Sequence, residues 1–138
     1  MVSIAMVMHR RLSILGLGDE GKQPMRSADG RYWISFNGEI YNYLALKEDL
    51  IKLGIKFRTD SDTEVILEAY RHWGTDAFNR FNGDWAFIIH DRLKKNVVVC
   101  RDRFGQKPLF VRESNSGLVF ASELQAIVKI EKSEVSHR

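Results

Sequence analysis

Two stretches near the middle of the chain repeat their apolar residues at the spacing of an amphipathic helix. In the first, Leu46, Leu50 and Leu53 follow one another at intervals of four and three residues, and charged residues fill most positions between them. This spacing places the three leucines on one face of a helix. Gly54 comes directly afterwards, and glycine commonly ends a helix.

The second helix is predicted to begin at Ser61 and to end at Gly74. Ser61 and Glu64 have the spacing of a capping box, in which each side chain accepts a hydrogen bond from the backbone amide of the other. The apolar face of this helix is expected to consist of Val65, Ile66, Ala69, Tyr70 and Trp73. A further short helical turn is predicted over residues 77–81.

Short runs of aromatic and β-branched residues predict strands on both sides of the helices. The predicted strands cover residues 2–15 (as one strand or two), 31–37, 85–91, 97–101, 109–112 and 118–121. Residues 16–30 are expected to form a loop, Asn37-Gly38 a tight turn that ends a strand, and residues 122–128 a closing helix. This order indicates an α+β fold with helices packed on antiparallel sheet, not a parallel doubly wound fold.

The composition narrows the class of protein. At 138 residues, 44% of them hydrophobic, the chain is long enough for one well-cored domain and too short for two. The formal charge of +3 is small and spread along the sequence, so it does not indicate a nucleic-acid partner. No apolar run is long enough to span a membrane, and the single cysteine excludes an internal disulfide framework. These features predict a soluble, cytoplasmic protein.

Three patterns are weak candidates for chemistry. The glycines of residues 16–21 match the dinucleotide-binding pattern G-x-G-x-x-G, but Pro24 follows where that motif requires a helix. The four histidines, at positions 9, 72, 90 and 137, lack metal-ligand spacing, so no metal site is expected. Cys100 lies in an apolar run and is expected to be an inert strand thiol, with a catalytic pair formed with His90 as the alternative.

Three groups of polar residues have both a structural and a functional interpretation. Arg10-Arg11 is either a solvated strand edge or a guanidinium fork for a carboxylate. Asn37-Gly38 is either a hairpin turn or a corner whose side-chain amide and backbone N–H stabilise an oxyanion. Glu39 and Asp62 are either surface and helix-start acids or two carboxylates that bind an ammonium group. Taken singly, each group favours the structural interpretation.

Seven motifs in a fixed order favour the functional interpretation. They are HRRLSI at residues 9–14, QPM at 23–25, FNGEIYN at 36–42, SDTEVI at 61–66, NGDWAF at 82–87, RDRFGQKPL at 101–109 and FASEL at 120–124. The series closely resembles the glutaminase domain of glutamine-hydrolysing asparagine synthetases, which is a class II glutamine amidotransferase. The resemblance covers nearly the whole chain.

The resemblance implies an Ntn-hydrolase fold, an α+β four-layer αββα sandwich of two antiparallel sheets, here without the N-terminal strand that carries the catalytic residue. It implies hydrolysis of L-glutamine and delivery of ammonia to a synthetase domain, which would use ATP and Mg²⁺ to amidate aspartate. Residues 1–130 would form a partial amidotransferase domain, and residues 131–138 would begin a linker. No cofactor is expected in this chain itself, and a homodimeric parent enzyme is left open.

Carried over motif by motif, the resemblance assigns most of a glutamine site. Arg11 would bind the α-carboxylate of glutamine. The pocket would be lined by backbone groups of Leu12, Ser13, Ile14 and Leu15. Asn37 and Gly38 would form the oxyanion hole, and Glu39 and Asp62 would hold the α-ammonium group.

The nucleophile of the family is absent from this chain. In the family it is a cysteine at the mature N-terminus, whereas this chain begins Met1-Val2-Ser3, and Cys100 aligns with the middle of a strand. The chain alone is therefore expected to be inactive. The fold is expected to be marginal unless residues 2–7 replace the pairing of the missing strand. A non-catalytic or regulatory module that binds glutamine without hydrolysing it is the alternative.

Overall fold

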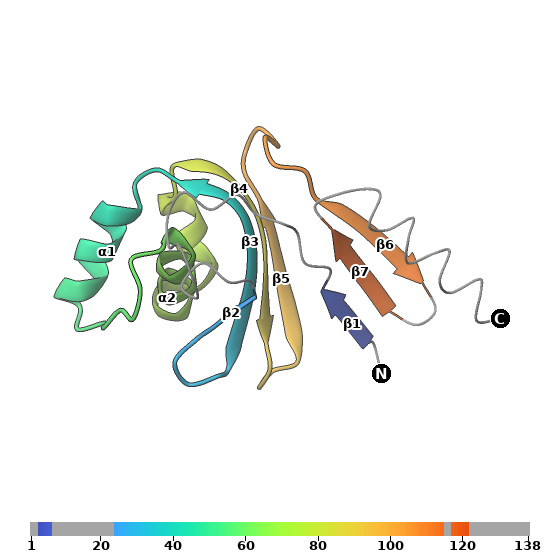
Figure 1. The fold of residues 1–138 in the computed structure, drawn as a ribbon, viewed down its shortest axis with the longest axis horizontal. Helices are drawn as coiled ribbons and strands as arrows, with labels where there is room; N and C mark the ends of the chain where they lie inside the picture. The colour runs from blue at the N-terminus through green and yellow to red at the C-terminus, as the bar shows by residue number, and fades with distance from the viewer. Residues whose placement is uncertain (1–2, 7–23, 115–116, 122–138) are drawn as a thin grey trace.

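The computed structural model describes residues 3–6, 24–114 and 117–121, and within them it contains two β-sheets, two α-helices and a 3₁₀-helix (Figure 1). In chain order the elements are β1 (Ser3–Met6), β2 (Met25–Arg26), β3 (Tyr32–Ile40), α1 (Tyr43–Lys52), α2 (Asp62–Trp73), the 3₁₀-helix η2 (Gly74–Arg80), β4 (Gly83–Asp91), β5 (Asn96–Arg101), β6 (Phe110–Ser114) and β7 (Gly117–Ala121).

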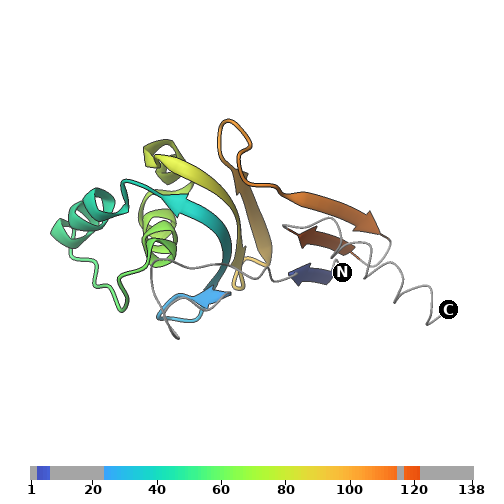
Figure 2. The same cartoon turned by 45° about the horizontal axis from the view of Figure 1, so that its top comes forward.

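These elements form stacked layers. One sheet has the strand order β2-β3-β4-β5 and is antiparallel throughout, and the other has the order β1-β7-β6. The helices cover one face of the larger sheet, and the smaller sheet lies on its other side (Figures 1 and 2). The predicted α+β sandwich of two sheets is confirmed. The described residues supply three of its layers, one of helices and two of sheet.

One strand pairing departs from the antiparallel pattern that was expected. β1 runs parallel to β7, with Ser3 opposite Gly117 and Met6 opposite Phe120, whereas β6 and β7 form an antiparallel hairpin. The fold was expected to be marginal unless residues 2–7 pair with a neighbouring strand. Residues 3–6 form such a pairing with β7.

The central strand β4 is buried on both faces, because its sheet is covered by helices on one side and by the second sheet on the other. Trp85, Phe87 and Ile89 belong to the core between the sheet and the helices. Ala86 and Ile88 alternate with them, so they point to the opposite face, and they are buried as well. The middle of β4 is therefore a continuous run of apolar residues and does not alternate between apolar and polar residues.

Both predicted helices are present, with small changes at their ends. α1 buries Leu46 and Leu50, but it ends before Leu53, whose side chain is exposed. α2 begins after Ser61 and ends before Gly74, which has a φ of 63°. This positive φ is accessible to glycine at little cost, and it explains why the helix ends there.

The predicted capping box at the start of α2 is half correct. The Ser61 Oγ accepts a hydrogen bond from the N–H of Glu64 at 3.3 Å, as predicted. The Glu64 carboxylate instead accepts from the N–H groups of Arg58 and Thr59 and from the Thr59 hydroxyl, while the N–H of Ser61 donates to Thr59 Oγ1. The N–H of Ser61 is thus bound by Thr59 and not by Glu64. The Glu64 carboxylate instead connects the loop before α2 to the helix.

The prediction that Asn37-Gly38 ends a strand as a tight turn is wrong. β3 continues to Ile40, and its register with β4 is unbroken along its whole length. Gly38 permits this because it has a φ of 132°, and because a Cβ at this position would lie 2.0 Å from the carbonyl oxygen of Asp84. The glycine therefore serves a close approach of two paired strands.

Other expectations are changed or fall outside the described residues. The loop predicted over residues 16–30 contains β2, whose two residues are too few to show a period and which pairs with Trp33 and Ile34 of β3. The helical turn predicted over residues 77–81 is present as part of η2, which begins earlier, at Gly74, and ends at Arg80. The predicted strand beyond residue 6 and the predicted helix over residues 122–128 lie outside the described residues.

Replacing Asp91 with asparagine is expected to lower the stability of the fold at neutral pH and to make that stability less sensitive to acidification. Arg31 donates to both carboxylate oxygens of Asp91, at 3.0 and 2.8 Å, and two backbone amides also donate to this carboxylate. The Arg31 guanidinium is the main reason why the pKa of Asp91 falls from 3.8 to about 2. Because the folded-state pKa is the lower one, ionised Asp91 stabilises the fold above about pH 4, and this contribution is lost as the pH falls towards about 2.

Thermal unfolding of the wild type and of D91N between pH 7 and pH 2 tests this expectation. The difference in Tm is expected to be largest near neutral pH and to shrink as Asp91 becomes protonated. A difference that stays the same over the whole range would contradict it.

Candidate functional site

Asn37 and Glu39 project from the face of the larger sheet that points away from the helices. Residues directly opposite each other in an antiparallel pair point to the same face. Asn37 therefore shares this face with Ala86, and Glu39 shares it with Asp84. Asn37 is partly buried and Glu39 is exposed, so an amide and a carboxylate stand in a row towards the end of β3.

Successive backbone N–H groups of this segment point to opposite edges of β3. The N–H of Tyr41 donates to Asn82 on the β4 side at 2.7 Å, whereas the N–H of Ile40 donates to the carboxylate of Asp62 at 3.1 Å. Because alternate residues of a strand share an edge, the Gly38 N–H points to the same edge as that of Ile40, about 7 Å away.

Asp62 connects α2 to this edge. It is fully buried in the first turn of α2, where the helix dipole favours a negative charge. Its Oδ2 accepts the Ile40 N–H. Glu39 thus lies on the face of the sheet that points away from the helices, whereas Asp62 of α2 contacts the next residue of β3, Ile40, at the strand edge.

Hydrogen bonds also fix the end of β3 against the start of β4. The Tyr41 hydroxyl donates to Asp84 Oδ2 at 2.8 Å, and this hydrogen bond is the main reason why the pKa of Tyr41 is raised. The Asn42 side chain donates to the carbonyl of residue 80 and accepts the N–H of residue 82. Tyr41 and Asp84 lie in the motifs FNGEIYN and NGDWAF, but their position near Glu39 follows only from the strand register.

Asp102 organises the loop after β5, next to the start of β4. Its carboxylate accepts hydrogen bonds from the backbone amides of Trp85, Phe104, Gln106 and Lys107. Burial alone would raise the pKa of Asp102, but these four donors together hold it below its usual value. The Arg101 guanidinium, which comes from the same face as Asn37, donates to the carbonyls of Gly105 and Lys107.

Cys100 lies on the opposite face of the sheet from Asn37. It is paired with Phe87 on the helix side, and its sulfur accepts the indole N–H of Trp85 at 3.4 Å. Burial raises the pKa of the Cys100 thiol, which is consistent with the predicted inert strand cysteine. His90 is paired with Val97 and points to the other face, so the alternative of a Cys100–His90 catalytic pair is wrong.

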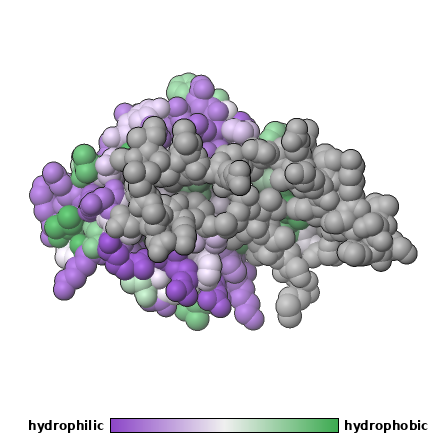
Figure 3. Space-filling model, viewed as in Figure 1, coloured by the Kyte–Doolittle hydropathy of each residue, from purple (hydrophilic) through white to green (hydrophobic). Residues whose placement is uncertain are grey.

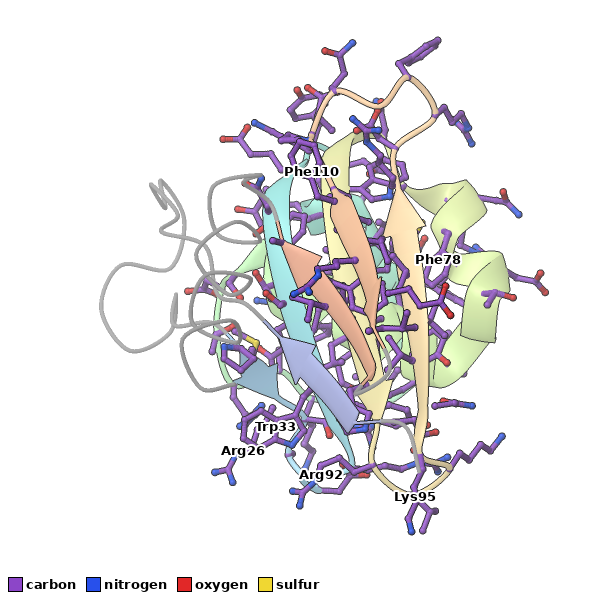
Figure 4. All side chains as sticks on the ribbon, turned by 90° about the vertical axis from the view of Figure 1, so that its right-hand side faces the viewer. Arg26, Trp33, Phe78, Arg92, Lys95 and Phe110 are labelled. Atoms are coloured by element: carbon purple, nitrogen blue, oxygen red, sulfur yellow. The ribbon has the colours of Figure 1, made fainter. Side chains whose placement is uncertain are left out.

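Charged residues lie at both ends of the larger sheet. Glu39 and Asp84 mark the end where β3 finishes and β4 begins. Arg26, Arg92 and Lys95 lie at the other end (Figure 4), and the first two guanidiniums lie 5.5 and 5.8 Å from the ring centre of Trp33.

The surface around the helices is largely hydrophilic (Figure 3). Exposed apolar side chains there include Leu44 and Ile51 on α1, and Leu53 just beyond it. Within the part of the chain that the structure describes, no helix has both the length and the apolar content needed to cross a bilayer.

The structure brings four of the predicted site residues to one end of β3, namely Asn37, Gly38, Glu39 and Asp62. Arg11, Leu12, Ser13, Ile14 and Leu15 lie outside the described residues, so their contacts stay predictions.

Comparison of the sequence with known proteins gives a consistent set of matches. A family model described as a glutamine amidotransferase domain matches residues 2–137. Asparagine synthetase [glutamine-hydrolyzing] 1 of Bacillus subtilis is 44% identical over 119 residues, which cover 86% of this chain and 19% of that protein. Putative asparagine synthetase [glutamine-hydrolyzing] 1 of Methanocaldococcus jannaschii is 44% identical, with coverage of 86% and 21%. This chain thus spans about a fifth of the length of these relatives.

Solved structures match the fold over most of the chain. Glutamine phosphoribosylpyrophosphate amidotransferase from B. subtilis, complexed with ADP and GMP, superposes with a TM-score of 0.69 and 28% identity, covering 80% of this chain and 26% of that one. A structure described as the allosteric regulatory enzyme of purine biosynthesis gives a TM-score of 0.70 and 28% identity, covering 82% and 26%. These matches confirm the predicted type of sandwich.

Proposed function

This chain belongs to the family of glutamine amidotransferase domains, and we propose that it binds L-glutamine at the end of β3. The observation that carries the proposal is that Asp62, which comes from a different element, accepts the N–H of Ile40, the residue directly after Asn37, Gly38 and Glu39 in β3. The family match supports the same site, because it covers both segments.

The chemistry of these groups fits the two polar ends of glutamine. The Asn37 amide and the Gly38 N–H are donors for the oxygen of the side-chain amide, which becomes an oxyanion when a nucleophile attacks it. Glu39 and Asp62 are acceptors for the α-ammonium group. Arg11 is proposed to bind the α-carboxylate, because a guanidinium forms two parallel hydrogen bonds to such a group.

We propose further that the chain corresponds to the glutaminase portion of an asparagine synthetase. The relatives that bear this name are about five times as long as the matched region, so amidation of aspartate with ATP and Mg²⁺ would belong to their remaining portion. Within this chain, ATP and Mg²⁺ are assigned to no residue. A homodimeric parent, a cytoplasmic location and a domain boundary at residue 130 stay predictions.

Residues 1–138 alone are expected to bind glutamine without hydrolysing it. Hydrolysis in this class uses a cysteine next to the oxyanion donors, and Cys100, the single cysteine of the sequence, lies on the face opposite Asn37. Oxyanion donors stabilise charge that develops in the transition state, so they do not accelerate hydrolysis of glutamine when no nucleophile attacks it.

Calorimetric titration of the 138-residue chain with L-glutamine, together with an assay for released ammonia, tests both statements. Glu39→Gln is expected to weaken binding about tenfold or more, because a hydrogen bond between charged partners loses one of its charges. Glu48→Gln, on an exposed face of α1, is the matched control and should bind like the wild type. Failure of the wild type to bind glutamine would contradict the proposed function, and ammonia release that Arg11→Ala abolishes would contradict the expected inactivity.

A further inference from the structure

Phe104 is the most exposed large apolar side chain among the described residues, at 85%. It lies in the loop formed by residues 102–107, which follows β5 and projects past one end of the larger sheet (Figure 1). A single exposed apolar side chain is common on protein surfaces and does not by itself indicate a partner. The way in which this loop holds Phe104 is what distinguishes it.

Hydrogen bonds fix the backbone of the 102–107 loop on both sides of Phe104. The Asp102 carboxylate accepts the N–H of Phe104 itself at 3.0 Å and the N–H groups of two further loop residues. The Arg101 guanidinium donates to two loop carbonyls at 2.6 and 2.7 Å. The N–H of Gly105, which has a φ of 63°, donates to the Asp102 carbonyl at 3.1 Å. The loop is therefore ordered before anything binds to it, so a partner loses little affinity to the cost of ordering it.

The loop lies beside the proposed glutamine site. The N–H of Asp102 donates to the Trp85 carbonyl at 2.8 Å, and Trp85 is directly opposite Gly38 in the register of β3 and β4. Tyr41, which follows β3 at this end of the sheet, is also exposed, at 59%. Aromatic side chains are enriched in protein–protein interfaces and among the residues that contribute most to binding. Two of them are thus exposed next to the site.

We propose that the 102–107 loop, with Phe104 as its main contact, is the surface on which the remaining portion of the parent synthetase docks. The inference rests on the proposed function, in which this chain is the glutaminase portion of a longer enzyme. Because this chain spans about a fifth of the relatives, the greater part of each relative lies outside the matched region and is available as the partner.

The position of the loop favours this partner over an unrelated protein. In the parent enzyme, ammonia would leave from the glutamine site at this end of the sheet. Water protonates free ammonia to ammonium, which is not a nucleophile. The portion that uses ammonia therefore has to lie close to the glutamine site, and a partner docked on Phe104 would lie there.

Hydroxyl-radical footprinting of Phe104 in two proteins tests the proposal. One is the 138-residue chain alone, and the other is a fusion in which this chain replaces the matched region of the complete Bacillus subtilis relative. Phe104 is expected to be oxidised readily in the chain alone and to lose most of this oxidation in the fusion. Leu93, which is 72% exposed in the turn between β4 and β5 at the opposite end of the sheet, should be oxidised equally in both.

The variant Phe104→Ser tests whether the ring contributes to docking. In the chain alone it should leave the Tm unchanged, because an exposed side chain gives up no burial. In the fusion it should lower the Tm, because the ring is buried there. Leu93→Ser is the matched control and should leave both Tm values unchanged. If the fusion does not fold, the same footprints are taken with the chain mixed with the remaining portion of the B. subtilis protein.

The outcomes separate this inference from the proposed function. Equal oxidation of Phe104 with and without the remaining portion overturns the docking role, and a chain that binds glutamine would still support the proposed function. Protection of Phe104 in the chain alone would assign the loop to a contact between two copies of this chain, which also overturns the proposal. A chain that does not bind glutamine overturns the proposed function, whatever the footprint of Phe104.

Discussion

Alanine at position 38 is expected to destabilise the fold by about 3 kcal/mol or more, because strain and overpacking each cost roughly 1–3 kcal/mol and both apply here. Gly38 has a φ of 132°, and an added Cβ would lie 2.0 Å from the Asp84 carbonyl oxygen. The clashing atoms belong to the backbones of two paired strands, so neither can move without opening the register of β3 and β4. Urea unfolding of G38A and of the wild type measures the loss.

Gly54 provides the matched control for this prediction. It has a φ of 93°, but a Cβ there would have nothing within 4 Å, so G54A adds backbone strain without a clash. Its expected cost is about 1 kcal/mol. Gly83→Ala should resemble G38A, because its Cβ would lie 2.1 Å from the Glu39 carbonyl oxygen. Equal losses in G38A and G54A would show that the close approach of the strands is not the cause.

Glu64→Ala is expected to cost about 3 kcal/mol, because buried donors that lose their acceptor cost about 1–3 kcal/mol each. The Glu64 carboxylate is fully buried and accepts the N–H groups of Arg58 and Thr59 and the hydroxyl of Thr59. Its removal frees the loop that leads into α2. Because Asp62 lies in the same helical turn, glutamine affinity is expected to fall together with stability. Chemical unfolding and glutamine titration of the variant measure the two effects.

Asp60→Asn is the control for the Glu64 prediction. Asp60 lies in the same loop and forms an ion pair with Lys47 at 3.0 Å, but its side chain is 95% exposed. An exposed ion pair contributes about 0–1 kcal/mol, so D60N should unfold almost like the wild type. If Glu64→Ala is equally mild, the carboxylate is not what holds the loop to α2.

The helices could be predicted because their apolar residues repeat with a clear period, and most strands could be predicted because they are short runs of aromatic and β-branched residues. The end of β3 could not be predicted, because Asn37-Gly38 is the dipeptide that a tight turn favours. A glycine indicates that the backbone can adopt a positive φ, but it does not indicate whether a turn or a close contact between strands needs that angle. Here Gly38 faces β4, where Gly83 also has a positive φ, and the two glycines allow a close contact between strands. That use depends on a partner strand far away in the sequence.

The candidate site could be predicted only as far as its residues lie in local sequence motifs. Asn37, Gly38, Glu39 and Asp62 lie in recognisable motifs, and the structure places all four at one end of β3. The contact between Tyr41 and Asp84 joins residues 43 positions apart, and nothing in the local pattern of either segment specifies it. The faces of Cys100 and His90 likewise follow only from the register of β4 and β5, which excluded them as a catalytic pair.

The parallel pairing of β1 with β7 also has a consequence for the order in which the protein folds. It joins the first described strand to the last, with Ser3 opposite Gly117, whereas the β6–β7 hairpin and the contact of α1 with α2 join neighbouring segments. Closing a long loop costs more chain entropy than closing a short one, and long-range pairings slow folding. During synthesis on the ribosome, β1 emerges before the other described elements, and almost all of the described chain has to follow before its partner strand exists. We therefore expect β1 to join last, onto a hairpin that has already formed.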